Sequence, residues 1–314
     1  MKQILKAADI ESAVKEAKNQ HLEIGLVPTM GALHEGHLSL IERALKENDL
    51  VVVSLFVNPI QFNNKEDLEK YPRTIEADLE LIKNLELRIK NEAKATALLA
   101  FTPTVEEMYP ADGGRATEGS KSAIPQEVYH FGPVEEVMEG PRRPGHFSGV
   151  AVVVRRLFDL AQPTRAYFGE KDYQQIAVIR SLLEQIKYPI ELVPCPIVRA
   201  DDGLALSSRN MRLSPAARAI APTINATLEQ AAEMAEYEEV DDVKEWVLDT
   251  LSSFHEVNPS LCPNDLKFEP EYFEIVDAIT LQPIAEWADA EKNGAVGCIA
   301  VWLDGVRLID IVKF

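Results

Sequence analysis

The sequence predicts an α/β protein in which a doubly wound parallel sheet precedes a smaller α+β domain. Up to about residue 199, apolar runs rich in β-branched residues alternate with amphipathic segments. Beyond that point, two acidic helical segments precede three strand-like ones. A length of 314 residues also suits two domains. We therefore expect domains at 1–199 and 200–314.

The first βαβ unit is predicted near the N-terminus. Residues 23–28 and 50–57 are short apolar runs, typical of buried parallel strands. Between them, Leu38, Ile41 and Leu45 fall at helical spacing, with charged residues on the opposite face. This order of strand, helix and strand predicts a right-handed crossover.

The same alternation continues along the chain. Residues 74–86 have the pattern of an amphipathic helix, and residues 150–160 repeat valine and leucine at helical spacing in spite of their β-branched content. Residues 165–168 and 190–194 are strand candidates, separated by a helix that starts near Asp172. Repeated alternation of this kind predicts helices on both faces of the sheet.

The C-terminal region has a different pattern. Ser214 followed by Pro215 is typical of a helix start, and two acidic helices are expected at about 215–235 and 241–254. The strand candidates that follow are 268–276, 295–303 and 306–312. Asp304-Gly305 between the last two indicates a two-residue hairpin turn, so we expect a small antiparallel sheet.

Charge and cysteine usage exclude several classes of function. A formal net charge of -19 repels nucleic-acid backbones and anionic membranes, so neither is an expected partner. The three cysteines, Cys195, Cys262 and Cys298, are far apart and odd in number, which predicts buried thiols in place of disulfides or zinc ligands. The N-terminus lacks the apolar core of a secretory signal, and together these features predict a cytoplasmic protein.

The strongest motif is PTMGALHEGH, residues 28–37, between the first predicted strand and its helix. Gly31 and Gly36 permit a tight turn, and a helix beginning after His37 would direct free N–H groups at a phosphate. His34 and His37 can donate to the same oxyanion. We interpret the motif as a triphosphate site. Surface histidines or a metal site are the alternatives, and a P-loop is excluded because its sequence is absent.

Two shorter motifs offer further phosphate ligands. GEKD, residues 169–172, lies at another strand-to-helix junction, where Lys171 can neutralise a phosphate and Asp172 can cap the helix or accept from a ribose hydroxyl. LSSRN, residues 206–210, offers two hydroxyls and a guanidinium. The alternatives are an ordinary helix cap and a polar hinge with a structural arginine.

Two other segments carry polar groups suited to a small ligand. NPIQF, residues 58–62, follows the second strand, and its amides suit a carboxylate or hydroxyl-bearing ligand or an ordinary strand-to-helix turn. RRPGHF, residues 142–147, is a basic island that either meets an anionic substrate, as part of a lid, or forms a structural loop.

In this order the motifs VPTMGALHEGH, FVNPIQF, YPRT, RPGHF, FGEKDYQQ and LSSRN resemble the pantoate–β-alanine ligases along the whole chain. The resemblance implies a Rossmann-like domain of the nucleotidyltransferase superfamily, a C-terminal α+β domain that acts as a lid, and a homodimer formed through the N-terminal domain. It also implies ATP-dependent condensation of (R)-pantoate with β-alanine to pantothenate. The reaction would pass through pantoyl-adenylate and release AMP and pyrophosphate.

The resemblance assigns roles to residues at matching positions. The implied catalytic residues are His34, His37, Lys171 and Arg209, with His37 as proton donor. The implied ATP contacts are Met30, Gly31, Ala32, Leu33, His34, Glu35, Gly36, His37, Gly169, Glu170, Lys171, Asp172, Val198, Leu206, Ser207, Ser208 and Arg209.

The resemblance also implies contacts for the other substrates and for a metal. Gln61, Gln175 and Asn58 would bind pantoate or β-alanine. Asp78 matches an acidic position near the Mg²⁺ ion that accompanies ATP.

Two segments depart from the family's pattern. Residues 86–100 are longer than the brief strand usual there, and residues 111–128, which are polar and Gly/Ser-rich, form an expanded stretch that predicts a surface loop. They affect the sheet edge and the predicted dimer surface but contain no motif residue.

Other classes of function remain open from the residues themselves. The nearest is a nucleotidylyltransferase acting on a small phosphorylated substrate, which shares the HxGH site. A non-catalytic nucleotide-binding protein is a further alternative, although the motifs are intact.

Overall fold

The computed structural model describes residues 1–110, 127–263 and 266–314, and the chain forms two compact units. Unit 1 comprises Met1–Phe131, Arg143–Gly169 and Val178–Cys195, and unit 2 comprises Gly132–Arg142, Glu170–Ala177 and Pro196–Phe314. Two short segments of unit 2 thus precede residue 200 in the sequence, and the division into domains at 1–199 and 200–314 stays a prediction.

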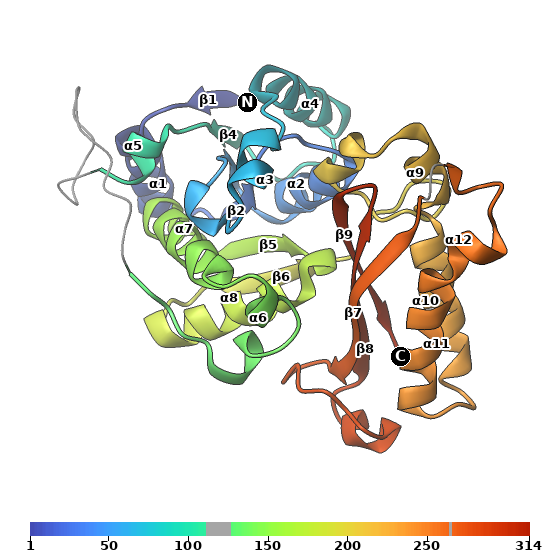
Figure 1. Cartoon of the computed structure of the whole chain (residues 1–314). Helices are drawn as coiled ribbons and strands as arrows, with labels where there is room; N and C mark the ends of the chain where they lie inside the picture. Colours follow the sequence, from blue (N-terminus) through green and yellow to red (C-terminus); the bar gives the residue numbers. More distant parts are fainter. Residues whose placement is uncertain (111–126, 264–265) are drawn as a thin grey trace. The chain divides into compact units, whose positions relative to one another are not determined.

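Unit 1 is built on a six-stranded sheet in which every neighbouring pair of strands is parallel. The spatial order is β1-β4-β3-β2-β5-β6 (Figure 1). The strands are β1 Lys2–Ile4, β2 Ile24–Thr29, β3 Leu50–Leu55, β4 Ala97–Phe101, β5 Arg165–Gly169 and β6 Glu191–Cys195. The strands that follow β2 in the sequence, β3 and β4, are added on one side of it, whereas β5 and β6 are added on the other side. The topological switch point, where open α/β sheets bind ligands, therefore lies between β2 and β5.

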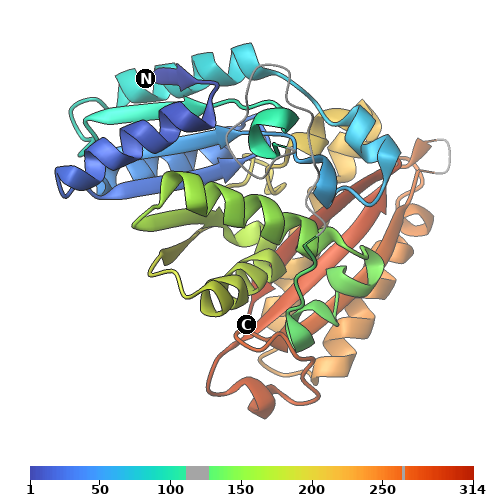
Figure 2. The same cartoon turned by 90° about the vertical axis from the view of Figure 1, so that its left-hand side faces the viewer.

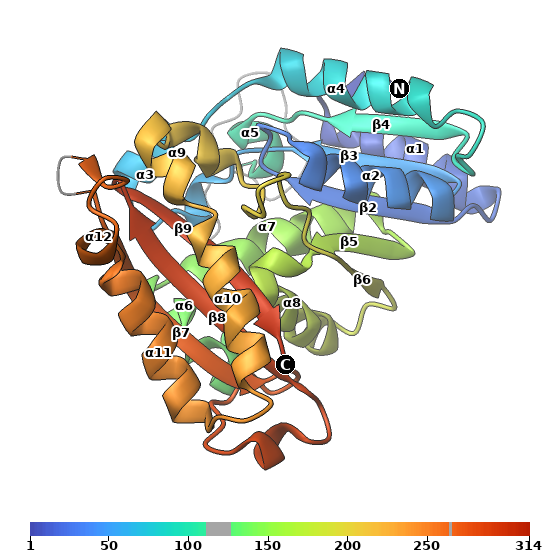
Figure 3. The same ribbon diagram turned by 90° about the vertical axis from the view of Figure 1, so that its right-hand side faces the viewer.

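Helices cover both faces of this sheet, which confirms the predicted doubly wound fold. α1 packs on α7 on one face, and α2 packs on α4 on the other (Figures 2 and 3). The helices are α1 Ala7–Asn19, α2 Glu35–Glu47, α3 Lys65–Lys70, α4 Ile75–Arg88, α5 Val105–Met108, α7 His146–Ala161 and α8 Tyr173–Ile186. The ambiguous stretch 150–160 is helical, as its spacing predicted.

Unit 2 contains a three-stranded antiparallel sheet with the order β7-β8-β9. Its strands are β7 Phe268–Asp277, β8 Ala295–Leu303 and β9 Val306–Lys313. Asp304 and Gly305 both adopt positive φ, 53° and 68°, which is the backbone that a two-residue type I′ turn requires. The hairpin predicted from Asp304-Gly305 is therefore confirmed.

The helices of unit 2 correct one prediction. Residues 215–235 do not form one helix, because the chain breaks at Pro222 into α9 Pro215–Ile220 and α10 Thr223–Met234. A proline inside a helix lacks the N–H donor and clashes with the preceding turn. The remaining helices are α6 Glu139–Arg142, α11 Val240–Ser252 and α12 Phe254–Val257. α11 packs on β7 and α10 on β9, over a common apolar core.

A buried ion pair attaches the segment 132–142 to the sheet of unit 2. The Arg307 guanidinium on β9 donates to both oxygens of Glu139, at 2.7 and 2.8 Å. The Tyr272 hydroxyl on β7 donates to the same carboxylate at 2.7 Å. The Arg307 and Glu139 side chains are only 14% and 10% exposed, and Arg307 also donates to Glu271 at 2.6 Å, so this network of charges is largely removed from solvent.

Among the residues that the structure describes, none of the helices is long and apolar enough to cross a membrane.

Candidate active site

The first motif forms a tight turn directly after β2. Gly31 and Ala32 adopt positive φ, 80° and 51°. The Asp78 carboxylate, on the first turn of α4, accepts from Ala32 N at 2.9 Å and from Leu33 N at 2.8 Å. Asp78 is 1% exposed. This carboxylate therefore stabilises the left-handed turn, because it accepts hydrogen bonds from two buried backbone N–H groups.

The two histidines of the motif cap α2. The helix begins at Glu35, so the prediction that it begins after His37 was wrong: His34 is the N-cap and His37 lies in the first turn. His34 Nδ1 accepts from Gly36 N at 3.2 Å, and His37 Nδ1 accepts from His34 N at 3.3 Å. The first N–H groups of α2 are therefore partly satisfied by the two rings. An imidazole nitrogen can accept a hydrogen bond here, as the Ser and Glu side chains do in an ordinary capping box.

The capping arrangement determines which nitrogen of each ring carries the proton. A neutral imidazole has one donor and one acceptor nitrogen. Since Nδ1 accepts in both His34 and His37, the proton of each neutral ring is on Nε2. The ring centroids are 4.0 Å apart. The two N–H donors are thus held as a pair at the carboxyl end of β2.

Gln61 lies beside this motif. It ends the short 3₁₀ helix Pro59–Gln61 that follows β3, and its Nε2 donates to Met30 Sδ at 3.0 Å. Asn58 donates from Nδ2 to Gln61 Oε1 at 3.2 Å. The structure therefore brings together Met30, Asn58 and Gln61, which sequence reasoning placed in one site.

Three residues around Gln61 were not predicted to belong to the site or were left open. Tyr109 donates to Asn58, Gly149 accepts from Asn58, and His146 Nδ1 lies 2.8 Å from the Gln61 carbonyl oxygen. Only the RRPGHF motif gave a signal for any of them, and it pointed to His146 as part of a basic island. Tyr109 and Gly149 are distant in sequence and carried no motif signal of their own.

Gly169 ends β5, the strand next to β2. Because parallel strands end at the same edge of a sheet, Gly169 and the turn after Thr29 flank the switch point. This is where the GEKD motif was expected, and the 3₁₀ helix Glu170–Asp172 follows at once.

In unit 2, the GEKD residues are held by ion pairs. Glu170 accepts from Lys313 Nζ on β9 at 2.8 Å. Lys171 Nζ lies 3.8 Å from Asp172 Oδ2, and its side chain is 18% exposed. Gln175 follows in the first turn of α8.

The remaining predicted ATP contacts of unit 2 form one loop. Leu206 N donates to the Val198 carbonyl at 3.0 Å, so these two residues lie side by side. Ser207 then caps the 3₁₀ helix Ser208–Arg212 by accepting from Arg209 N at 3.3 Å. Arg199, within the loop, donates to Asp310 Oδ2 on β9 at 2.6 Å and anchors it to the sheet. The loop is thus an ordered, hydrogen-bonded turn that is anchored to β9.

A metal site made by protein groups alone is not found in the described part of the chain, where no three His, Cys, Asp or Glu residues cluster as ligands. Asp78, the predicted Mg²⁺ contact, also accepts from the Thr74 hydroxyl at 3.2 Å. Its assignment as a metal ligand stays a prediction.

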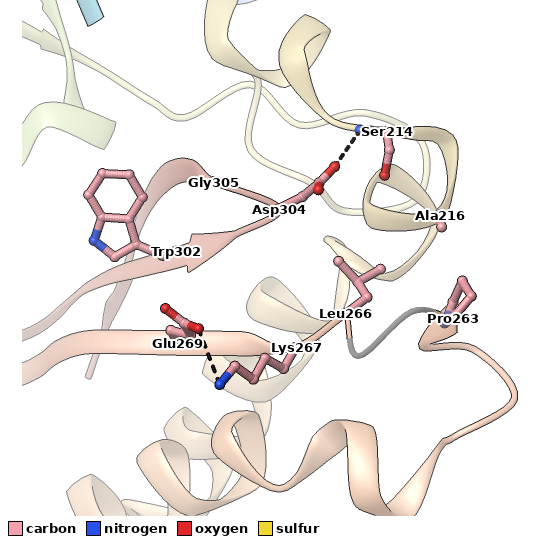
Figure 4. Close-up of a pocket in the computed structure, with 9 residues that line it drawn as sticks. All are labelled: Ser214, Ala216, Pro263, Leu266, Lys267, Glu269, Trp302, Asp304 and Gly305. Atoms are coloured by element: carbon pink, nitrogen blue, oxygen red, sulfur yellow. Dashed lines mark hydrogen bonds and ion pairs between the residues drawn. The ribbon is translucent and has the colours of Figure 1, made fainter. Parts of the chain in front are cut away.

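A cavity of about 460 Å³ lies in unit 2 (Figure 4). Asp304 accepts from Ser214 N at 3.0 Å on one side, and Lys267 pairs with Glu269 at 3.3 Å on another. The lining residues are Ser214, Ala216, Pro263, Leu266, Lys267, Glu269, Trp302, Asp304 and Gly305. None of these lining residues was predicted to contact a substrate, ATP or a metal, so the cavity carries no part of the candidate site.

Comparison with known proteins identifies the family. The family model described as pantoate-beta-alanine ligase matches residues 2–313. The chain belongs to the pantoate–β-alanine ligase family. It is 47% identical to a pantothenate synthetase of Porphyromonas gingivalis over 98% of this chain and 97% of that protein. It is 45% identical to one of Bacteroides thetaiotaomicron, over 100% and 99% of the two chains.

Solved structures agree with this family. A pantothenate synthetase from Thermus thermophilus superposes with a TM-score of 0.79 and 40% identity, covering 100% of this chain and 99% of that one. A pantoate-beta-alanine ligase from Francisella tularensis, complexed with beta-gamma ATP and beta-alanine, gives a TM-score of 0.71 and 29% identity, over 100% and 97%. Membership in this ligase family confirms the resemblance deduced from the motifs and makes the chain an ATP-dependent acid–amine ligase.

Proposed function

We propose that this chain condenses (R)-pantoate with β-alanine at the expense of ATP, through a pantoyl-adenylate, with release of AMP and pyrophosphate. The observation that carries the proposal is the turn after β2, at the switch point of the sheet, where the Nε2–H donors of His34 and His37 lie in the same unit as Gln61. The family match over residues 2–313 supports it.

In the first step, a pantoate carboxylate oxygen attacks the α-phosphorus of ATP and pyrophosphate leaves. The chain's contribution is to position the two substrates and to stabilise the negative charge that develops on the phosphates. His34 and His37 would donate to phosphate oxygens, with His37 as the proton donor of the leaving group. Gln61 would hold the pantoate and later the β-alanine.

Unit 2 supplies the cationic groups in this proposal. Lys171 and Arg209 would neutralise phosphate charge, and the loop from Leu206 to Arg209 would close over the nucleotide as a lid. Gln175 would bind pantoate. The central spatial hypothesis is that these groups and the two histidines act on one triphosphate.

In the second step, the β-alanine amine attacks the mixed anhydride and AMP leaves. No covalent enzyme intermediate is required, because the acyl-adenylate itself is the activated species. Cys195, Cys262 and Cys298 are buried and take no part.

A magnesium ion is part of the proposal. Mg²⁺ usually binds through one or two carboxylates together with substrate phosphates, so phosphate oxygens of ATP would be its main ligands. When bound, it would neutralise part of the phosphate charge. The buried and hydrogen-bonded Asp78 fits a structural brace better than an open metal ligand.

A homodimer formed through the N-terminal domain and a cytoplasmic location also remain proposals.

The deciding experiment is pantoate-dependent exchange of labelled pyrophosphate into ATP, without β-alanine. We expect exchange that requires pantoate, because the adenylate forms before the amine is needed. Addition of β-alanine should then release AMP in amounts equal to pantothenate. Exchange that is independent of pantoate, or AMP retained on an acceptor phosphate, would contradict the proposal and favour a nucleotidylyltransferase.

A further inference from the structure

The side-chain amide of Gln61 has its orientation set by two neighbouring side chains, Asn58 and Met30. Gln61 Oε1 accepts from Asn58 Nδ2 at 3.2 Å, so its Nε2 is turned toward Met30 Sδ, 3.0 Å away. A thioether is a weak acceptor. A substrate oxygen, which is a stronger acceptor, could therefore replace the Met30 sulfur as the partner of the Gln61 N–H group.

The orientation of Asn58 is determined in turn by the backbone. Its Oδ1 accepts from Ile60 N at 3.3 Å, and its Nδ2 donates to the Gly149 carbonyl at 3.0 Å. A backbone N–H only donates and a carbonyl only accepts, so these two bonds favour one orientation of the Asn58 amide. That orientation presents a donor to Gln61 and leaves the N–H groups of Gln61 for the ligand.

Tyr109 completes this arrangement. Its hydroxyl donates to Asn58 Oδ1 at 2.9 Å, and the residue is 3% exposed. Burial raises the pKa of the Tyr109 hydroxyl, so it remains a donor at every working pH. With this bond, both lone pairs of Oδ1 and both hydrogens of Nδ2 of Asn58 are engaged. Asn58 is 1% exposed, which leaves it no surface for a ligand.

The backbone of Gln61 is fixed at the same place. A Cβ at Gly149 would lie 2.7 Å from Gln61 Cα, so only glycine permits this close approach of α7. The imidazole of His146 also donates to the Gln61 carbonyl from Nδ1, at 2.8 Å, because a carbonyl can only accept. The main chain and the side-chain amide of Gln61 are thus both held by neighbouring protein groups.

We propose that Tyr109 is a positioning residue for the acid-binding amide: it acts through Asn58 to hold Gln61 as a hydrogen-bond donor to an oxygen of the substrate. The inference rests on the proposed function, and it changes the assigned role of Asn58 from a substrate contact to a positioning residue. The class of ligand it selects is a small molecule with an acceptor oxygen, such as a carboxylate or a hydroxyl.

The test is Tyr109→Phe, with Tyr167→Phe as a matched control. Tyr167 is a fully buried tyrosine of the same unit whose hydroxyl donates to Glu47 at 2.8 Å and accepts from Asn48 at 2.7 Å. Both variants lose one buried hydroxyl, so a general structural effect should be similar in the two. Steady-state kinetics would be measured with each substrate varied in turn.

We expect Tyr109→Phe to raise the KM for pantoate about three- to tenfold, the factor that corresponds to one neutral hydrogen bond, with a KM for ATP within about twofold of wild type. Tyr167→Phe should leave both values unchanged. A second readout is the side-chain amide signal of Gln61 in ¹H–¹⁵N spectra, assigned with Gln61→Glu, which should shift in Tyr109→Phe and not in Tyr167→Phe.

The inference is overturned if the KM for pantoate is unchanged in Tyr109→Phe, if it rises equally in Tyr167→Phe, or if the Gln61 amide signal does not move. A failure of the proposed function would look different, because the wild-type protein itself would then lack pantoate-dependent exchange of pyrophosphate.

Discussion

Replacing Asp78 tests whether its carboxylate supports the turn after β2 or binds a metal ion. Its carboxylate accepts two hydrogen bonds, from the backbone of Ala32 at 2.9 Å and of Leu33 at 2.8 Å, and is 1% exposed. If the brace is its function, the protein without ATP or metal already depends on it. If metal binding is its function, the loss should be visible only when Mg²⁺ is limiting.

The magnitude follows from these two bonds. A hydrogen bond to a charged group contributes roughly 1.5–3 kcal/mol. Asp78→Ala removes two of them, so we expect the free energy of unfolding to fall by about 3–6 kcal/mol. Asp78→Asn keeps one acceptor oxygen but directs an amide N–H at the second backbone donor, and a loss of roughly 2–3 kcal/mol is expected.

The assay is urea denaturation of the protein in EDTA, followed by circular dichroism, together with the Mg²⁺ dependence of pyrophosphate exchange. Thr74→Val is the matched control, because it removes only the hydroxyl that donates to Asp78 at 3.2 Å and no side-chain cap of α4. We expect the control to lose about 1.5 kcal/mol, the low end of the range for a hydrogen bond to a charged group, because its bond of 3.2 Å is the longer one.

The reasoning is refuted by an Asp78→Asn protein that unfolds in EDTA like the wild type and needs a higher Mg²⁺ concentration for exchange. In that case Asp78 would be a metal ligand, as the family resemblance implies, and the hydrogen bonds to the turn would contribute little.

Three other predictions concern separate parts of the chain. His37→Ala and Lys171→Ala should each lower pyrophosphate exchange about 10²–10³-fold, with an unchanged circular dichroism spectrum; near-normal exchange would contradict the assigned roles. The hydrogen bond from Lys94 and then that from Arg165 lower the pKa of Glu23 to about 2, which a ¹³C NMR titration should reproduce. Because this folded-state pKa is depressed, the stability contributed by Glu23 is complete above its ordinary pKa of 4.5 and is lost as the pH falls through about 2, so Glu23→Gln should flatten the acid limb of the stability curve. Burial raises the pKa of the Cys298 thiol to about 12, so iodoacetamide at pH 8 should label Cys298 only after denaturation, and labelling of the native protein, detected by peptide mass spectrometry, would refute this.

Much of the fold could be predicted because its signals are local. The strands β2 and β3 are continuous apolar runs, and the Asp304-Gly305 turn has a backbone that few residues adopt. β1 was not predicted, since it has only three residues and two of them are exposed. The break at Pro222 could have been expected from the proline alone. Most of the segment 111–128 lies outside the described residues.

The site was predictable to the extent that motifs carry it. The HxGH and NPIQF motifs predict His34, His37 and Gln61 as site residues, but no pattern predicted that the histidines would cap their own helix. Nor could spacing reveal Tyr109, which meets Asn58 across 51 residues of sequence. Contacts of this kind are made by tertiary packing, and a single sequence contains no local trace of them.

The passage of the chain between its two units has a consequence for protein engineering. Glu139 precedes Arg307 by 168 residues, yet both belong to unit 2, and Tyr173 donates to the Ala278 carbonyl at 3.0 Å within the same unit. A truncation after residue 199 would remove Arg307, the partner of the Glu139 carboxylate, and Ala278, the partner of Tyr173 at the start of α8. The C-terminal sheet is therefore not a detachable module, and grafting it between relatives would succeed only if residues 132–142 and 170–177 were exchanged with it.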